Sequence, residues 1–180
     1  MKQKMSETLE IPAGVSCEYK HKVFVCKADG KTLKRALNLP GITVDVSEHK
    51  IHIHTTSGNK KTFTSIRSTI AHLNNLFKGL KEEFVYTLEA CNVHFPMTLK
   101  LDKHMLTINN FLGEKVPRHA PILEGVDVEI KGQKITLKSA DREAAGQTAA
   151  NIETATKVRN RDRRVFQDGI FITSRPGGMA

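Results

Sequence analysis

The sequence predicts an α+β protein made of two tandem, duplicated domains, each a small antiparallel β-sheet packed against one α-helix. Three observations support this fold class. The chain repeats itself at long range, short segments alternate between apolar and polar residues, and each alternating region is followed by a segment with helical periodicity.

The repeat is the main organising feature. GITVDVSEHKIHIH at 41–54 aligns without a gap on GVDVEIKGQKITLK at 125–138, and HKVFVCKADGKTLKR at 21–35 aligns on HMLTINNFLGEKVPR at 104–118. The offset is 83 or 84 residues throughout. A period this long indicates duplication of a whole folding unit, not a short solenoid repeat.

Strands are predicted where apolar residues recur at every second position, as Ile51 and Ile53 do. The polar segments 47–50 and 131–134 suit hairpin turns, and so does Asp29-Gly30, since glycine tolerates a positive φ. The segment 92–100 is also expected to be a strand. Pro96 within it lacks a backbone donor and would mark an edge or a bulge.

Two helices are predicted. From Phe63, apolar residues recur in steps of three and four through Leu80, which indicates about five helical turns, with Gly79 expected at the end. A second helix is expected at roughly 141–157, with a weaker stripe of small residues. Gly146 would cost this helix about 1 kcal/mol relative to alanine. We therefore expect Gly146 to allow close approach to the sheet; the alternative is a glycine tolerated on an exposed face.

These elements define the expected organisation: a first α+β repeat at 1–81, a second at 82–173 with a basic C-terminal segment, and a disordered tail at 174–180.

The charge favours a polyanionic partner. Lys and Arg number 28 against 19 acidic residues, which gives a net charge of +9 and a pI near 9.6. Nucleic acid is the commonest such partner. Residues 81–150 nevertheless carry a net charge of −1, so the basic character lies in the first half and near the C-terminus.

Membrane, secreted, disulfide-rich and zinc-binding classes of protein fit the sequence less well. No run approaches the ~18 apolar residues of a membrane span, and the N-terminal residues do not resemble a signal peptide. We therefore expect a cytoplasmic protein with no membrane partner. The three cysteines suggest neither a disulfide framework nor a zinc site.

The segment KVRNRDRR at 157–164 is the strongest candidate site. Arginine favours bidentate contacts with phosphate and stacking on bases. Asp162 and Asp168 favour a defined loop with internal ion pairs, and Asp168-Gly169 is typical of a turn. The alternative is a solvated charged loop without a ligand.

Motifs that would indicate a metal site or a catalytic site are weaker than the basic segment. His49, His52 and His54 suggest a metal site, but no further ligand is visible, so a polar strand face is favoured and no metal or cofactor is expected. Asp127 and Glu129 share a strand face without an evident nucleophile. No phosphate loop or hydrolase motif occurs. The sequence therefore predicts that the protein is not an enzyme.

Several motifs together resemble the ribosomal protein L-six family of the large subunit, in its archaeal form, whose eukaryotic counterpart is called L-nine. They are IPAGV near the start, NNFLGEKVPR, GQTAANIE and KVRNRDRRVFQDGIF, and the resemblance covers residues 8–173. It implies a structural protein that binds large-subunit ribosomal RNA, near the base of the stalk and the translation-factor-binding site. Neighbouring ribosomal proteins would be partners, with translation factors as further candidates.

The resemblance also gives the family positions of the candidate RNA-binding residues, and their contact with RNA is inferred from charge. It assigns Gln147 and Asn151 to the second-domain helix, and Gly113, Lys115 and Arg118 to the NFLGEK loop. The basic segment supplies Lys157, Arg159, Arg161, Arg163 and Arg164. For the basic residues near 113–119, an ordinary charged hairpin edge is an equal alternative. An alternative function is a protein-interaction module that docks an assembly partner through the acidic second domain.

Overall fold

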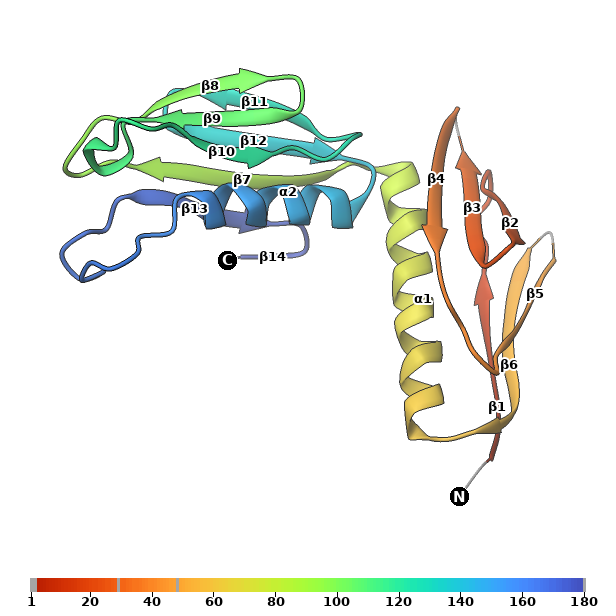
Figure 1. Cartoon of the computed structure of the whole chain (residues 1–180). Helices are drawn as coiled ribbons and strands as arrows, with labels where there is room; N and C mark the ends of the chain where they lie inside the picture. The colour runs from red at the N-terminus through yellow and green to blue at the C-terminus, as the bar shows by residue number, and fades with distance from the viewer. Residues whose placement is uncertain (1–2, 29, 48, 180) are drawn as a thin grey trace. The chain divides into compact units, whose positions relative to one another are not determined.

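The structure is a computed structural model that describes residues 3–28, 30–47 and 49–179 of the 180-residue chain. The chain divides into two compact units, residues 1–82 and 83–180. Each unit contains antiparallel sheets and one α-helix (Figure 1). The predicted α+β class with a duplicated unit is confirmed, but each unit holds two sheets where one was expected.

Unit 1 (residues 1–82) has two three-stranded antiparallel sheets, ordered β1-β6-β5 and β2-β3-β4. Its helix α1 packs against strands of both sheets (Figure 1). The elements are β1 Gln3–Glu10, β2 Ser16–Lys20, β3 Val23–Ala28, β4 Lys31–Ala36, β5 Thr43–Val46, β6 Lys50–Gly58 and α1 Lys60–Lys81.

Unit 2 (residues 83–180) has a three-stranded sheet, β10-β9-β8, and a five-stranded sheet, β11-β12-β7-β13-β14. Its helix α2 packs against β7, β12, β13 and β10 (Figure 1). The elements are β7 Phe84–Cys91, β8 Thr98–Asp102, β9 Met105–Asn109, the 3-10 turn η1 Phe111–Gly113, β10 Arg118–Pro121, β11 Asp127–Lys131, β12 Lys134–Ser139, α2 Arg142–Ala155, β13 Gly169–Arg175 and β14 Gly178–Met179.

The duplication is visible in strand register. In the β5–β6 hairpin Val44 lies opposite Ile53. In the β11–β12 hairpin Val128 lies opposite Leu137, which is the same pair displaced by the repeat offset. The aligned segments therefore fold into equivalent hairpins, with Ile53 and Leu137 fully buried.

The duplication also extends to side-chain hydrogen bonds. The Thr55 hydroxyl donates to the carbonyl of Gly41 at 2.8 Å, and the Ser139 hydroxyl donates to the carbonyl of Gly125 at 2.7 Å. Each bond ties the end of a hairpin to its beginning. Both occupy the same position of the repeat, so the connection into each helix is built in the same way.

Helix α1 begins three residues before the predicted stripe. Asn59 caps it in a reciprocal capping box with Thr62. Phe63, expected on the buried face, is 42% exposed, because it lies in the first turn where its ring contacts the Arg67 guanidinium instead. Gly79 lies within the helix, which continues to Lys81 and ends at Glu82 in extended conformation.

Helix α2 packs as its small residues predict. Ala145, Ala149 and Ile152 are fully buried. A Cβ atom added to Gly146 would lie 3.0 Å from the hydroxyl of Tyr86 on β7. The prediction that Gly146 permits close approach to the sheet is therefore confirmed.

Two elements of the structure differ from those that the sequence predicted. Pro96 lies in the loop between β7 and β8, since the predicted strand at 92–100 begins only at Thr98. Asp168-Gly169 does not form a turn, because Asp168 is buried and Gly169 begins β13.

The C-terminal residues expected to be disordered form a hairpin instead. Ser174 pairs with Met179, and Arg175 pairs with Gly178. Gly177 provides the positive φ of 87° at the turn. Of the expected turns, Gly30 has a φ of 76°, whereas Asp29 and Glu48 lie outside the described residues.

Each unit has its own core. The core of unit 1 is centred on Phe24, Ile51, Ile53, Ile66 and Leu73. The core of unit 2 is centred on Leu88, Leu106, Ile108, Phe111, Ile135, Leu137 and Ile152. In the part of the chain that the structure describes, no helix is long and apolar enough to cross a membrane.

Candidate nucleic-acid interface

The basic segment forms a loop, residues 157–168, between α2 and β13; we call it the basic loop (Figure 1). Its first anchor is Thr156, which is 2% exposed. The Thr156 hydroxyl donates to the carbonyl of Glu153 at 3.2 Å and accepts the N–H of Ile170 at 2.9 Å. This residue therefore ends the helix and joins it to the strand on the far side of the loop.

The second anchor is Asp168, which is 1% exposed. Its carboxylate accepts the backbone N–H groups of Val93 and His94 at 2.8 and 3.0 Å, and ring Nδ1 of His94 lies 2.6 Å from its other oxygen. Burial alone would raise the pKa of Asp168. The hydrogen bonds from His94 and Val93 outweigh it and hold this pKa below its usual value. The loop thus ends on an ionised, satisfied buried carboxylate.

A turn around Asp162 orders the middle of the basic loop. The backbone carbonyl of Asp162 accepts the N–H groups of Val165 and Phe166, at 3.2 and 2.9 Å. Its carboxylate accepts the Arg164 backbone N–H at 2.9 Å and pairs with the Arg164 guanidinium at 2.9 Å. The side chain and backbone of Arg164 hold the pKa of Asp162 below its usual value. The expected internal ion pair is therefore present.

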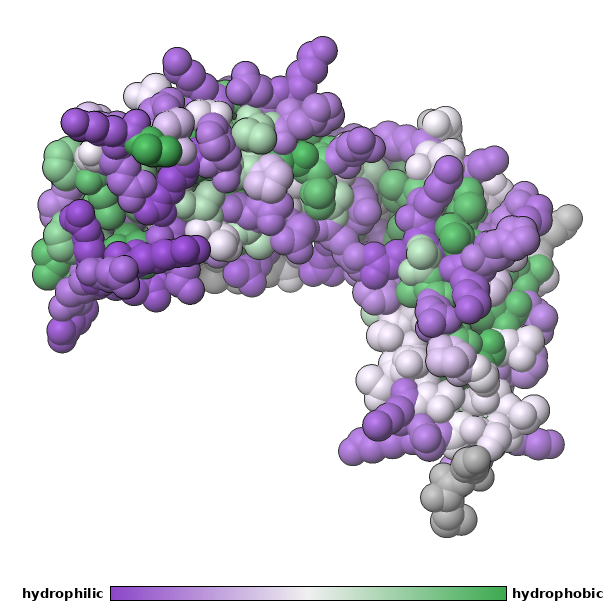
Figure 2. All heavy atoms as spheres, viewed as in Figure 1, coloured by the Kyte–Doolittle hydropathy of each residue, from purple (hydrophilic) through white to green (hydrophobic). Residues whose placement is uncertain are grey.

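All five basic side chains of this loop are exposed, and Figure 2 shows hydrophilic side chains gathered over the loop. Arg161 lies 4.8 Å from the centre of the Phe166 ring. Lys157, Arg159 and Arg163 have no side-chain hydrogen bond or ion pair to any described residue. Three cationic groups are thus free to meet an external anion.

Arg118 makes several contacts within unit 2. Its guanidinium donates to both carboxylate oxygens of Glu114, at 2.6 and 2.8 Å, and to the carbonyls of Ala155 and Lys157, at 2.9 and 3.2 Å. It also lies 4.2 Å from the centre of the Phe111 ring. Most of its donors are therefore used inside unit 2, where Arg118 holds the end of α2 and the start of the basic loop.

The loop before Arg118 is shaped by unusual backbone. Leu112 and Gly113 have φ values of 50° and 78°. A Cβ atom on Gly113 would contact the Phe95 ring at 3.5 Å, so its main constraint is the positive φ. Lys115 is exposed, with no side-chain partner among the described residues.

Gln147 and Asn151 lie one turn apart on α2. The Gln147 amide donates to Asn151 at 2.9 Å, and the Asn151 amide donates to the carbonyl of Pro121 at 3.1 Å. They line a polar groove with Arg118 and Arg159. The structure therefore brings together four predicted site residues from three separate segments.

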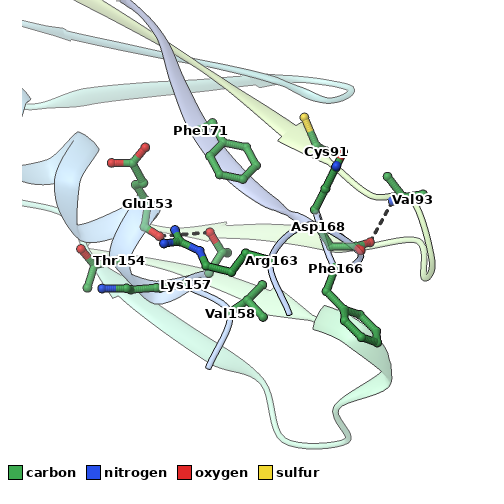
Figure 3. A pocket seen from close by; sticks show the side chains of 12 residues that line it. Cys91, Val93, Glu153, Thr154, Lys157, Val158, Arg163, Phe166, Asp168 and Phe171 are labelled. Carbon is green, nitrogen blue, oxygen red and sulfur yellow. Dashed lines mark hydrogen bonds between the residues drawn. The ribbon is translucent and has the colours of Figure 1, made fainter. Parts of the chain in front are cut away.

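A second hollow of about 790 Å³, which we call the aromatic hollow, lies beside the end of α2. Figure 3 shows Lys157 and Arg163 near the helix end, with Phe171 on β13. Phe166 and Val93 also line it. The sequence did not predict these apolar residues as part of the site, because only the pairing of β13 with β7 brings them there.

Other candidate residues do not join the site. His52 contacts the Thr8 hydroxyl at 3.0 Å, and His54 lies 3.5 Å from Asp45, all within unit 1. Across residues 3–28, 30–47 and 49–179, no group of three or more histidine, cysteine or acidic side chains could hold a metal ion.

Comparison with known proteins agrees with the resemblance of the motifs. A family model described as Ribosomal protein L6 matches residues 95–169. The large ribosomal subunit protein uL6 of Methanococcus vannielii is 41% identical over 95% of this chain and 94% of its own. The uL6 proteins of Haloarcula marismortui and Methanosarcina mazei are 40% and 38% identical. They cover 93% and 97% of this chain, and 94% and 99% of their own. At this identity over nearly its whole length, the chain belongs to the ribosomal protein L6 family.

Proposed function

We propose that this protein is a structural component of the large ribosomal subunit in the cytoplasm and that unit 2 binds large-subunit ribosomal RNA through the basic loop. The observation that carries the proposal is the loop itself. It is fixed at both ends by the buried groups of Thr156 and Asp168, yet it displays five exposed cationic side chains. Proteins of this family are structural rather than enzymatic.

The mechanism is electrostatic and geometric. Cations that contact phosphates release condensed counterions, which supplies sequence-independent affinity. A fixed loop loses little conformational freedom on binding, so its charges meet one arrangement of phosphates better than others. Folded RNA is read largely by shape in this way.

The groove and the hollow beside the loop add polar and apolar contacts. In the polar groove, the exposed amide of Gln147 and the guanidinium of Arg159 are placed to donate to phosphate or ribose oxygens. In the aromatic hollow, the Phe171 ring, 42% exposed, offers a surface on which an unpaired base could stack. Gly113, Lys115 and Arg118 would contribute contacts at the edge of the polar groove. Arg118 would act mainly by supporting the basic loop.

A docking function through the acidic face has less support. Glu129 on β11 pairs with Lys131 at 2.7 Å, so part of the acidic charge is neutralised within the strand. Position near the base of the stalk, contact with neighbouring ribosomal proteins and contact with translation factors are further parts of the proposal, drawn from the family.

The test measures binding of the full chain to transcribed large-subunit rRNA domains over a range of salt. Combining Arg161→Ala with Arg163→Ala should weaken binding and lower the slope of log affinity against log salt by about 2, roughly one per lost phosphate contact. The matched control is Lys131→Ala with Lys134→Ala, which removes the same charge from the β11–β12 hairpin and should change the slope much less.

An equal loss of slope in both double variants would contradict the assignment to the loop. Absence of the tagged protein from large subunits on a sucrose gradient would contradict the ribosomal role as a whole.

A further inference from the structure

The β2–β3 hairpin of unit 1 places two cysteines directly opposite each other. The hairpin turns on His21 and Lys22, whose φ values of 50° and 64° fit a two-residue type I′ turn. In the register that follows, Lys20 pairs with Val23, and three pairs further along Cys17 pairs with Cys26.

The turn also determines whether Cys17 and Cys26 form a hydrogen-bonded or a non-hydrogen-bonded pair. Residues that flank a two-residue turn form a hydrogen-bonded pair, and the two classes then alternate along an antiparallel ladder. Counting from Lys20 and Val23, the pair of Cys17 and Cys26 is non-hydrogen-bonded. Such pairs have Cα atoms about 4.5 Å apart, which lies within the range that a disulfide bridge spans.

The side chains agree with the backbone. The two sulfur atoms lie 2.7 Å apart, and both residues are free thiols. Cys26 is fully buried, whereas Cys17 is half-buried on the edge strand β2. The hydrogen bond between the two thiols holds the pKa of Cys17 below its ordinary value, against the opposing effect of burial.

A small reagent can reach Cys17 from outside. A hollow of about 260 Å³ lies beside it, lined by Glu18, Tyr19, Lys20, Val44 and Val46. Cys26 does not line this hollow. The pair therefore has one accessible and one shielded thiol, which is the arrangement of an attacking and a resolving cysteine.

We propose that Cys17 and Cys26 are a thiol modification site that forms a reversible cross-strand disulfide by exchange with a low-molecular-weight disulfide. The Cys17 thiolate attacks one sulfur of the reagent, forming a mixed disulfide and releasing one thiolate. Cys26 transfers its proton to the thiolate released in the first step and attacks the Cys17 sulfur, which releases the second thiolate. Two protein thiols are oxidised to one disulfide while the reagent is reduced to two thiols.

Cys91 supplies an internal comparison. It lies at the end of β7 in unit 2 and has no thiol partner among the described residues. Burial, with the nearby charges of Glu89 and Asp168, raises the pKa of its thiol. The proposal therefore predicts that Cys91 stays reduced under conditions that oxidise the pair.

The experiment treats the folded, reduced full chain with oxidised glutathione, blocks the remaining thiols with an alkylating reagent, and maps tryptic peptides by mass spectrometry. Cleavage at lysine places the three cysteines in separate peptides, 5–20, 23–27 and 82–100. The expected result is a disulfide joining peptides 5–20 and 23–27, reversed by dithiothreitol, with peptide 82–100 alkylated.

Serine variants test the assigned roles. Cys26→Ser should leave a stable glutathione adduct on Cys17, which does not accumulate on the wild-type chain. Cys17→Ser should leave Cys26 without an adduct, and Cys91→Ser should leave the wild-type result unchanged. The proposal is overturned if peptides 5–20 and 23–27 stay unlinked in the wild type. It is also overturned if Cys17 retains a glutathione adduct while Cys26 is present.

Discussion

Nδ1 of His94 lies 2.6 Å from the buried carboxylate of Asp168, and this pair joins the loop after β7 to the end of the basic loop. The two residues are 74 positions apart in the sequence. Their contact fixes where β13 begins, and it therefore fixes one end of the surface that we propose for RNA binding.

Replacing Asp168 with alanine should destabilise unit 2 and release the loop. The change leaves the N–H groups of Val93 and His94 without an acceptor, which should lower the free energy of unfolding by about 3 kcal/mol. Urea denaturation measures this loss. Asp127→Ala is the matched control, because Asp127 is exposed on β11 and its removal should change stability by less than about 0.5 kcal/mol. Equal stability of the two variants would contradict the anchoring role.

The same carboxylate makes a pH-dependent contribution to stability. Since its pKa is lower in the folded state, its contribution is fully present above the unfolded value of about 3.9 and is lost as pH falls through the folded value. The difference in unfolding free energy between the wild type and Asp168→Ala should therefore shrink between pH 5 and pH 2. A difference that stays constant over this range would argue against an ionised Asp168.

Arg118 and Arg159 should separate support from binding. Arg118→Ala removes the bonds that hold the end of α2 and should lower the free energy of unfolding by about 2 kcal/mol. Arg159→Ala should change stability by less than about 0.5 kcal/mol but lower the salt dependence of rRNA binding by about one unit of slope. Measuring both quantities for both variants tests the distinction, which fails if Arg159→Ala also destabilises the fold.

Gly146 and Tyr86 should show energetic coupling. Alanine at position 146 gains about 1 kcal/mol of helix propensity, but its Cβ would lie 3.0 Å from the Tyr86 hydroxyl. Removing that hydroxyl with Tyr86→Phe relieves the shortest contact and leaves the ring carbon that carried it, at 3.4 Å, as the nearest atom. Gly146→Ala should therefore stabilise the Tyr86→Phe protein by about 1 kcal/mol and the wild type by clearly less. A double-mutant cycle of urea denaturation measures the coupling, and purely additive effects would exclude the steric contact.

Local patterns were sufficient to predict the β5–β6 and β11–β12 hairpins and the second helix. Ile51 and Ile53 are buried as their alternation requires, because the period of a strand is set within a few residues. The role of Arg118 could not be predicted in this way. Its carbonyl partners on Ala155 and Lys157 are 37 and 39 positions away, so only the folded chain distinguishes it from a surface cation.

The start of strand β13 also could not be predicted from local sequence alone. The apolar residues near its start were visible in the sequence, but Asp168-Gly169 favoured a turn on local grounds. Pairing of Gly169 with Cys91 on β7 and the hydrogen bonds from Val93 and His94 to Asp168 override that preference. The predicted phosphate contacts of Lys157, Arg159, Arg161, Arg163 and Arg164 stay predictions.

The place of β13 in the sheet has a consequence for synthesis. Strand β7 is the first strand of unit 2 to be made, but its partner β13 is translated only after β8 to β12 and α2. During translation, unit 1 can therefore fold while the five-stranded sheet of unit 2 still lacks one of its central strands. The anchors of the basic loop depend on Ile170 and Asp168, so the arginine surface of the nascent chain is not ordered until these residues emerge. Vectorial synthesis thereby delays the ordering of the proposed RNA-binding loop until β13 has been made.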